Sequence, residues 1–161
     1  MQVNKIVLAI DPGFDRIGVA VLEKQTKEVV LFSECISTSP KDTHESRLEK
    51  IGLRVREIII EWNPRDLAIE KLFFNQNTTS ALKVAEARGV ILYEASLGGL
   101  EIFEYSPQAI KIAVTGYGKA SKSQVESMVE KLVVLKDNKK RLDDEMDAIA
   151  LGITHLAHIR N

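Results

Sequence analysis

The chain has 161 residues and a formal net charge of −1, with 45% hydrophobic and 28% charged residues. This length and balance predict one folded domain over residues 1–161 and argue against a disordered or linker-rich chain. The single cysteine, Cys35, excludes an intrachain disulfide, and we expect a cytoplasmic protein with no signal peptide and no membrane span.

The first part of the chain predicts a meander of three antiparallel strands. Three apolar runs of strand length are joined by short connections, the first of which contains the turn signal Asp11-Pro12-Gly13. The strands are expected at 5–10, 17–22 and 29–32.

From residue 43 onward, helices alternate with short strands. Apolar residues at three- and four-residue steps, capping Ser or Thr, and Gly or Pro stop signals define the helices. Helices are expected at 43–62, at 79–97, from Pro107, at 122–135 and at 144–158, with strands at 67–69 and 102–105. The order β-β-β-α-β-α-β-α-α-α predicts an α/β fold, a mixed five-stranded sheet flanked by helices.

The near-zero net charge hides an uneven distribution. Residues 107–142 contain eight Lys or Arg against three acids, whereas residues 143–161 contain four acids and one Arg. A basic rim beside an acidic centre is the pattern expected of a phosphate-binding surface around a metal site. A solvated, lysine-rich helix and loop would explain the basic stretch alone.

Four acids stand out by their positions. Asp11 and Glu70 each end an apolar strand, and Asp144 and Asp147 share one face at the start of the last helix. Taken singly, each has an ordinary explanation as a turn residue, an ion-pair partner or a complement to the helix dipole. Asp143, four residues before Asp147, is an alternative partner on that helix.

If these four carboxylates converge, they can stay ionised together only with bound cations. Oxygen donors without a cysteine or histidine cluster select Mg²⁺ or Mn²⁺. Two such ions suit the in-line attack of water on a phosphodiester, with basic side chains holding the flanking phosphates.

Four blocks of the sequence together resemble the RuvC Holliday-junction resolvases of the RNase H-like superfamily. The blocks are AIDPGFDRIGVAVLE at 9–23, LAIEKLFFNQNTTSALKVAEARGVIL at 67–92, FEYSPQAIKIAVTGYGKASKSQVESMV at 103–129 and DDEMDAIALGITH at 143–155. They cover nearly the whole chain in the family's order. The resemblance implies an RNase H-like fold and an endodeoxyribonuclease of recombination and repair. Its paired nicks at four-way junctions leave 5′-phosphate and 3′-hydroxyl ends.

By this resemblance, Asp11, Glu70, Asp144 and Asp147 are the catalytic, metal-binding acids, with two Mg²⁺ (or Mn²⁺) in each active site. The assignment of Asp144 over its neighbour Asp143 rests on this alignment and on the three-residue spacing to Asp147.

Expected DNA contacts lie on the loop after Glu70 and in the basic stretch. They are Phe73, Phe74, Asn75, Lys111, Lys119 and Lys122. An aromatic side chain on a loop beside a metal site is a good platform for base stacking, and Phe73 better matches the family's stacking position. We expect one phenylalanine of the pair in the core and the other exposed.

The resemblance also implies partners: four-way junction DNA, a second copy of the chain, and branch-migration motor proteins of the RuvA and RuvB type. The helix at 79–97 is apolar around more than one face, so one face can pack on the sheet and leave a surface for a second subunit. Two rival hypotheses remain, a YqgF-like nuclease that acts on RNA and a junction-binding protein without catalysis. His155 and His158 are interpreted as packing or surface residues rather than ligands.

Overall fold

The computed structural model describes residues 5–73 and 78–159. In chain order its elements are β1 (Ile6–Asp11), β2 (Arg16–Glu23), β3 (Glu28–Ser37), α1 (His44–Trp62), β4 (Asp66–Glu70), α2 (Thr78–Leu97), β5 (Glu101–Tyr105), α3 (Pro107–Thr115), α4 (Lys122–Leu132), β6 (Val133–Leu135) and α5 (Asp143–His158). None of the helices within these residues is long and apolar enough to cross a membrane.

The strands form one mixed sheet in the order β5-β4-β1-β2-β3-β6. β1, β2 and β3 pair antiparallel, which confirms the predicted meander. β4 pairs parallel to β1 on one side, and β5 continues the sheet parallel to β4.

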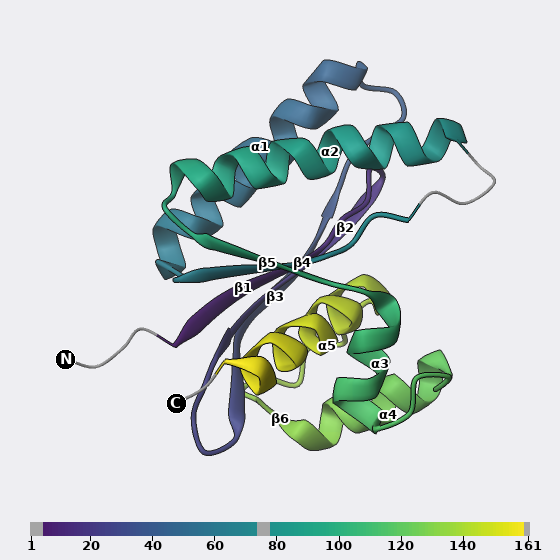
Figure 1. Cartoon of the computed structure of the whole chain (residues 1–161). Coiled ribbons are helices and arrows are strands. Elements are labelled where there is room, and N and C mark those ends of the chain that lie inside the picture. The colour runs from purple at the N-terminus through teal and green to yellow at the C-terminus, as the bar shows by residue number, and fades with distance from the viewer. Residues whose placement is uncertain (1–4, 74–77, 160–161) are drawn as a thin grey trace.

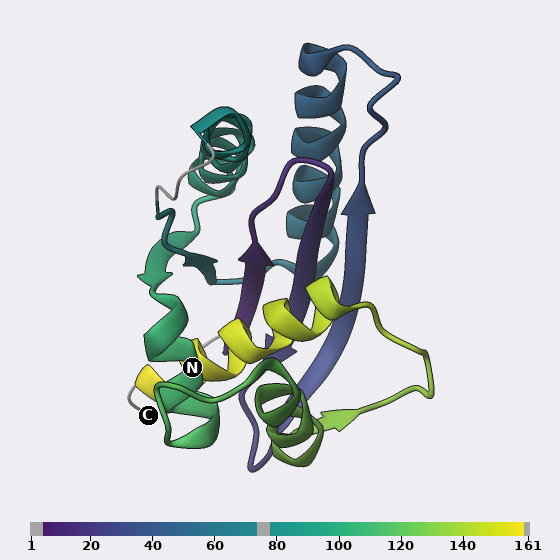
Figure 2. The same cartoon turned by 90° about the vertical axis from the view of Figure 1, so that its right-hand side faces the viewer.

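Helices cover both faces of the sheet. α1 and α2 lie on one face, and α3, α4 and α5 lie on the other (Figures 1 and 2). Leu8 and Ile10 of β1 pack toward α1 and α2, whereas Val7 and Ala9 pack toward α5. Burial on both faces explains why β1 reads as a continuous apolar run rather than an alternating one.

The sheet has six strands rather than the predicted five. The sequence predicted that the helix from Ser121 would continue to about residue 135, but α4 ends at Leu132 and β6 follows at once. Val133 and Val134 are β-branched and favour extended backbone. Pairing with Glu28–Val30 at the edge of β3 gives this short segment a partner 100 residues away in the chain, which local sequence patterns do not reveal.

Capping residues mark the observed helix bounds, and Thr43, expected inside the first helix, is instead its N-cap. The side chain of Thr43 caps α1 by accepting a hydrogen bond from the Ser46 N–H, and Asn63 ends that helix with a left-handed backbone. Ser106 caps α3, and Ser121 forms a capping box at the start of α4.

Candidate active site

Asp11 and Glu70 come together because they end two neighbouring parallel strands. Ile10 of β1 is in register with Ile69 of β4, so Asp11 and Glu70, which follow them, lie at the same end of these two strands. The carboxyls of Asp11 and Glu70 share a hydrogen bond. This pair confirms the expected juxtaposition of the two strand ends.

The first turn of α5 brings the other two acids, Asp144 and Asp147, to the same strand ends. Gly18 of β2 is the register partner of Asp11, and a Cβ on Gly18 would lie 1.9 Å from the backbone oxygen of Asp144. The glycine therefore permits α5 to start directly on β2, beside Asp11. All four acids are half-buried at the surface.

The four carboxyls form one electrostatic cluster. Burial raises the pKa of Asp11 to about 8, and the charges of Glu70, Asp147 and Asp144 add to the effect. Burial also raises the pKa of Glu70, against the opposing effect of its hydrogen bond with Asp11. The pKa of Asp147 is raised by burial and by Asp144, although Lys122 opposes the shift. Like charges gathered in a partly desolvated place explain all three directions.

Two basic side chains partly neutralise the helix acids. Arg16, at the start of β2, forms an ion pair with Asp144. Lys122 Nζ lies 3.4 Å from Asp143 Oδ2 and 3.6 Å from Asp147 Oδ2. The Asp143 side chain is 73% exposed and is not among the charges that act on Asp11, so Asp144 rather than Asp143 faces the strand acids.

Sequence reasoning did not single out Arg16. The clue in the sequence is that Arg16 stands at the start of the second strand, next to the turn that follows Asp11. The partner carboxylate of Arg16 lies on α5, more than a hundred residues later, so spacing along the chain could not reveal the contact.

The acids suit a hard divalent cation by their chemistry. Over residues 5–73 and 78–159, no three Asp, Glu, His or Cys side chains are arranged to hold an ion as they stand. Arg16 and Lys122 form ion pairs with the helix acids, while Asp11 and Glu70 act on each other's pKa. A bound cation would favour the ionised form of carboxyls whose pKa is raised. Donor sets made only of oxygen fit Mg²⁺ or Mn²⁺.

The predicted DNA contacts divide into three groups. Phe73 is 56% exposed three residues after Glu70, and Lys122 reaches the acid cluster. Lys111 lies half-buried on α3 and Lys119 is exposed between α3 and α4; neither forms an ion pair with the four acids. The remaining two, Phe74 and Asn75, lie outside the described residues.

His155 packs in the core, as predicted. It is fully buried, with Nε2 3.0 Å from Asp66 Oδ2 and Nδ1 2.9 Å from the Tyr105 hydroxyl. Burial lowers the pKa of His155. The network joins α5 to β4 and β5. Sequence patterns pointed to packing but not to these polar partners.

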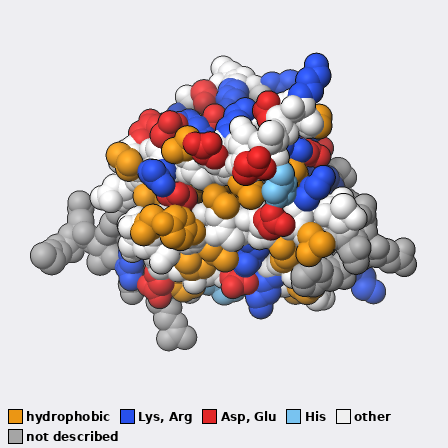
Figure 3. Space-filling view, turned by 90° about the horizontal axis from the view of Figure 1, so that it is seen from above, with side chains coloured by type: hydrophobic (Ala, Val, Ile, Leu, Met, Phe, Trp, Pro, Cys, Tyr) orange, Lys and Arg blue, Asp and Glu red, His pale blue; other side chains and the backbone are white. Residues whose placement is uncertain are grey.

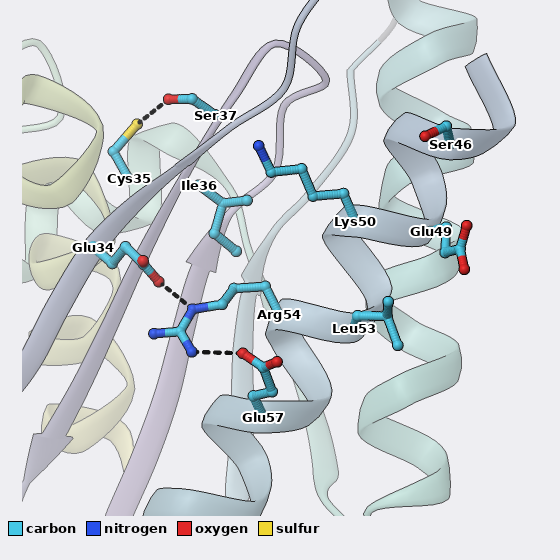
Figure 4. Close-up of a pocket in the computed structure, with 10 residues that line it drawn as sticks. All are labelled: Glu34, Cys35, Ile36, Ser37, Ser46, Glu49, Lys50, Leu53, Arg54 and Glu57. Atoms are coloured by element: carbon cyan, nitrogen blue, oxygen red, sulfur yellow. Dashed lines mark hydrogen bonds and ion pairs between the residues drawn. The ribbon is translucent and has the colours of Figure 1, made fainter. Parts of the chain in front are cut away.

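A groove of about 580 Å³ lies between β3 and α1, and none of the four acids lines it (Figure 4). Arg54 bridges the groove by donating hydrogen bonds to Glu34 and Glu57, each at 2.8 Å. The acid cluster is therefore not the floor of this groove. The cluster lies instead at the ends of β1 and β4 and on the first turn of α5.

Comparisons with known proteins agree with this geometry. The family model described as "Crossover junction endodeoxyribonuclease RuvC" matches residues 7–155. The crossover junction endodeoxyribonuclease RuvC of Halothermothrix orenii is 44% identical over 93% of this chain and 91% of its own length. That of Alkaliphilus metalliredigens is 42% identical over 93% and 92%.

A solved structure of T. thermophilus RuvC in complex with Holliday junction substrate superposes with a TM-score of 0.88 at 33% identity. It covers 94% of this chain and 92% of that one. The yeast mitochondrial Holliday junction resolvase Ydc2 has a TM-score of 0.70 at 12% identity, covering 93% of this chain and 78% of that one, and supports the fold alone.

Proposed function

Because the chain belongs to the RuvC family of crossover junction endodeoxyribonucleases, we propose that Asp11, Glu70, Asp144 and Asp147 are its catalytic acids. Membership makes the protein a metal-dependent nuclease that resolves Holliday junctions. The observation that carries the proposal is the convergence of four carboxyls from β1, β4 and α5, with the pKa of Asp11 raised to about 8 by burial and by its acidic neighbours.

The four acids would hold two Mg²⁺, or Mn²⁺ in their place. When bound, the ions would supply Lewis-acid chemistry for the attack of water on a phosphodiester, in keeping with 5′-phosphate and 3′-hydroxyl ends. The acids themselves fix the place of the reaction, since Asp11 and Glu70 are held by the sheet and Asp144 and Asp147 by the first turn of α5.

Lys122 supplies a positive charge at the same place. Burial works against its charged form, but the carboxylates of Asp147 and Asp143 outweigh that effect and raise its pKa. The ammonium group therefore stays protonated and can hold a phosphate oxygen of the attacked strand. Lys111 and Lys119 lie further along the same basic stretch and would hold flanking phosphates.

The loop after β4 would enter the junction. Phe73 is exposed and near Glu70 in the chain, so its ring can stack on an unpaired base beside the cleaved bond. We assign Phe74 and Asn75 to the same surface from their places in the sequence.

A second copy of the chain would pack on α2. Leu82, Tyr93 and Leu97 on the outer face of α2 are 59%, 60% and 64% exposed, while Ala87 and Ile91 face the core. Figure 3 shows hydrophobic side chains exposed among charged ones on the face that α1 and α2 cover. A twofold dimer places two acid clusters on one junction and accounts for paired nicks. We place the dimer in the cytoplasm, as one domain per chain, working with motor proteins of the RuvA and RuvB type.

The test is cleavage of a synthetic mobile four-way junction with Mg²⁺ or with EDTA, beside a linear duplex and an RNA–DNA hybrid. We expect paired nicks in the junction that require the metal. Asp147→Asn should lower cleavage by at least about 100-fold and leave junction binding intact, because binding depends mainly on basic side chains. Asp143→Asn is the matched control, and its cleavage should fall far less. Equal losses in the two variants would contradict the assignment of the helix acids, and preferential cutting of the hybrid would favour the YqgF-like alternative.

A further inference from the structure

The helix that carries Asp144 and Asp147 has an unusual N-terminus. Its N-cap residue is Leu142, whose side chain makes no capping hydrogen bond. Leucine has no oxygen to accept from the free N–H groups of the first turn, and it is among the poorest N-cap residues. The position of the two acids must therefore be fixed in another way.

Glu145 contacts this N-terminus in another way, by accepting from the backbone N–H of the N-cap residue itself. Its side chain is 3% exposed, although it stands between the half-buried acids Asp144 and Asp147 in the sequence. Its Oε2 accepts a hydrogen bond from the Leu142 N–H at 3.0 Å, and its Oε1 accepts from the Ser33 hydroxyl at 2.8 Å and from Lys139 Nζ at 2.7 Å. One carboxylate thus joins the first turn of α5 to β3 and to the loop before the helix.

The same contacts anchor the loop over residues 136–142. Lys139 Nζ also donates to the Ser33 carbonyl at 2.8 Å, and Arg141 Nε donates to the Ser33 hydroxyl at 3.0 Å. Ser33 lies on β3 beyond the three residues that pair with β6, so the loop continues along this edge where the strand stops. Figure 2 shows the connection from β6 leading to the start of α5 beside β3.

We propose that Glu145 is a positioning residue for cleavage, which sets the place of Asp144 and Asp147 by clamping the first turn of α5 to β3. The proposal rests on the function proposed for those two acids. Glu145 points away from the acid cluster, so it acts through the backbone of the turn and does not touch the substrate.

The rest of α5 does not need this clamp to fold. Ala148, Ile149, Leu151 and Leu156 are buried against the sheet and hold the body of the helix. Removal of the Glu145 carboxylate takes one hydrogen bond each from Lys139, Ser33 and the Leu142 N–H and frees the first turn, while the apolar contacts remain. The expected effect is therefore local to the turn that carries the acids.

The experiment compares Glu145→Ala with Glu61→Ala, which removes an exposed glutamate from the last turn of α1. We expect kcat for junction cleavage to fall about 10- to 100-fold in Glu145→Ala, the range seen when a residue that orients a metal ligand is lost. The KM for the junction should change less than about twofold, because no DNA-binding side chain is removed, and half-maximal cleavage should need more Mg²⁺. Glu61→Ala should match the unsubstituted protein in all three.

Two further measurements separate positioning from general stability. Glu145→Gln keeps an oxygen that can accept from the Leu142 N–H and should recover part of kcat. Hydrogen exchange in the metal-free, DNA-free protein should show faster exchange at residues 142–146 in Glu145→Ala, with the amides of β1 and β4 unchanged.

Glu145→Ala with unaltered kcat and Mg²⁺ dependence would overturn the proposal. If that variant does not fold, Ser33→Ala decides, since it removes one contact of the clamp, and a kcat equal to that of the unsubstituted protein would overturn the proposal as well. Failure of the unsubstituted protein to cut junctions would instead contradict the proposed function, and the exchange of residues 142–146 would still test the clamp.

Discussion

The raised pKa of Asp11 makes the stability of the metal-free protein depend on pH. Its pKa is about 8 in the folded protein and 3.8 ordinarily, so the folded state holds a proton that the unfolded chain releases. The stabilisation from this proton is complete below pH 3.8 and is lost as the pH rises through about 8. The metal-free protein should therefore lose stability toward alkaline pH.

Thermal unfolding in EDTA between pH 5 and pH 9 measures this effect. The Tm of the unsubstituted protein should fall more steeply than that of Asp11→Asn, which mimics the protonated side chain, and the gap should reach at least about 3 °C. Added Mg²⁺ should raise the Tm of the unsubstituted protein more at pH 8 than at pH 5, because the metal replaces the proton. Parallel Tm curves for the two proteins would contradict the raised pKa.

Phe73 yields a second prediction at this scale. Since the ring is 56% exposed, Phe73→Ala should change the free energy of unfolding by less than about 0.5 kcal/mol. Junction cleavage should fall about 5- to 150-fold, equivalent to the about 1–3 kcal/mol of a lost stacking contact. Ile60→Ala, at a 75% exposed position on α1, is the control and should retain full cleavage. A large loss of stability in Phe73→Ala would place the ring in the core instead.

The residues of the site differ in how far the sequence could predict them. The four acids were predictable because each stands at a strand end or a helix start, where local pattern and family resemblance agree. Arg16 and Glu145 were not, since each is defined by a partner more than a hundred residues away.

At the scale of elements, the seating of α5 on β2 depends on Gly18. A side chain there would collide with the backbone oxygen of Asp144, which cannot move without displacing the acid-bearing turn. Gly18→Ala should therefore destabilise the fold by about 1–3 kcal/mol and lower cleavage more than its stability loss explains. The measurements are denaturant unfolding and cleavage at a temperature where the variant is fully folded.

Gly89→Ala is the matched control for this substitution. A Cβ at Gly89 meets no atom within 4 Å, and the residue lies inside α2. Alanine there should stabilise the protein by about 0.4–1 kcal/mol. If the two substitutions had the same effect on stability, close approach of α5 to β2 would not be the reason for the glycine at position 18.

Element boundaries show where local pattern is sufficient. The helix starts after Ser106 and Ser121 are set by local caps and were predicted, whereas Thr43 was expected inside the first helix and is its N-cap. β6 depends on a strand partner at Glu28–Val30, and the extension of β3 to Ser37 depends on its pairing with β2. The sequence prediction therefore missed β6 and made the third strand too short.

At the scale of the whole molecule, the sequence predicted the class of fold and the meander, while the family resemblance supplied the remaining topology. Nothing in the apolar runs themselves says that β4 pairs with β1 rather than with β3. That pairing is what places Glu70 beside Asp11, so the local pattern alone could not have built the acid cluster.

The outer face of α2 provides the prediction for the assembly. Tyr93 is 60% exposed at the middle of this face, and the proposed dimer would bury it. Tyr93→Glu places a charge in that interface, and an unpaired buried charge opposes association strongly. The variant should therefore elute as a monomer in size-exclusion chromatography with light scattering, with an unchanged Tm when both proteins are measured as monomers.

Cleavage products report the same assembly independently. A monomer carries one acid cluster, so Tyr93→Glu should leave junctions with a single nick where the unsubstituted protein makes paired cuts on opposed strands. Ile60→Glu charges a 75% exposed apolar position on α1 and should remain dimeric with paired nicks. If Tyr93→Glu stays dimeric and Ile60→Glu does not, the second copy packs on α1, and the two acid clusters would face the junction from a different geometry.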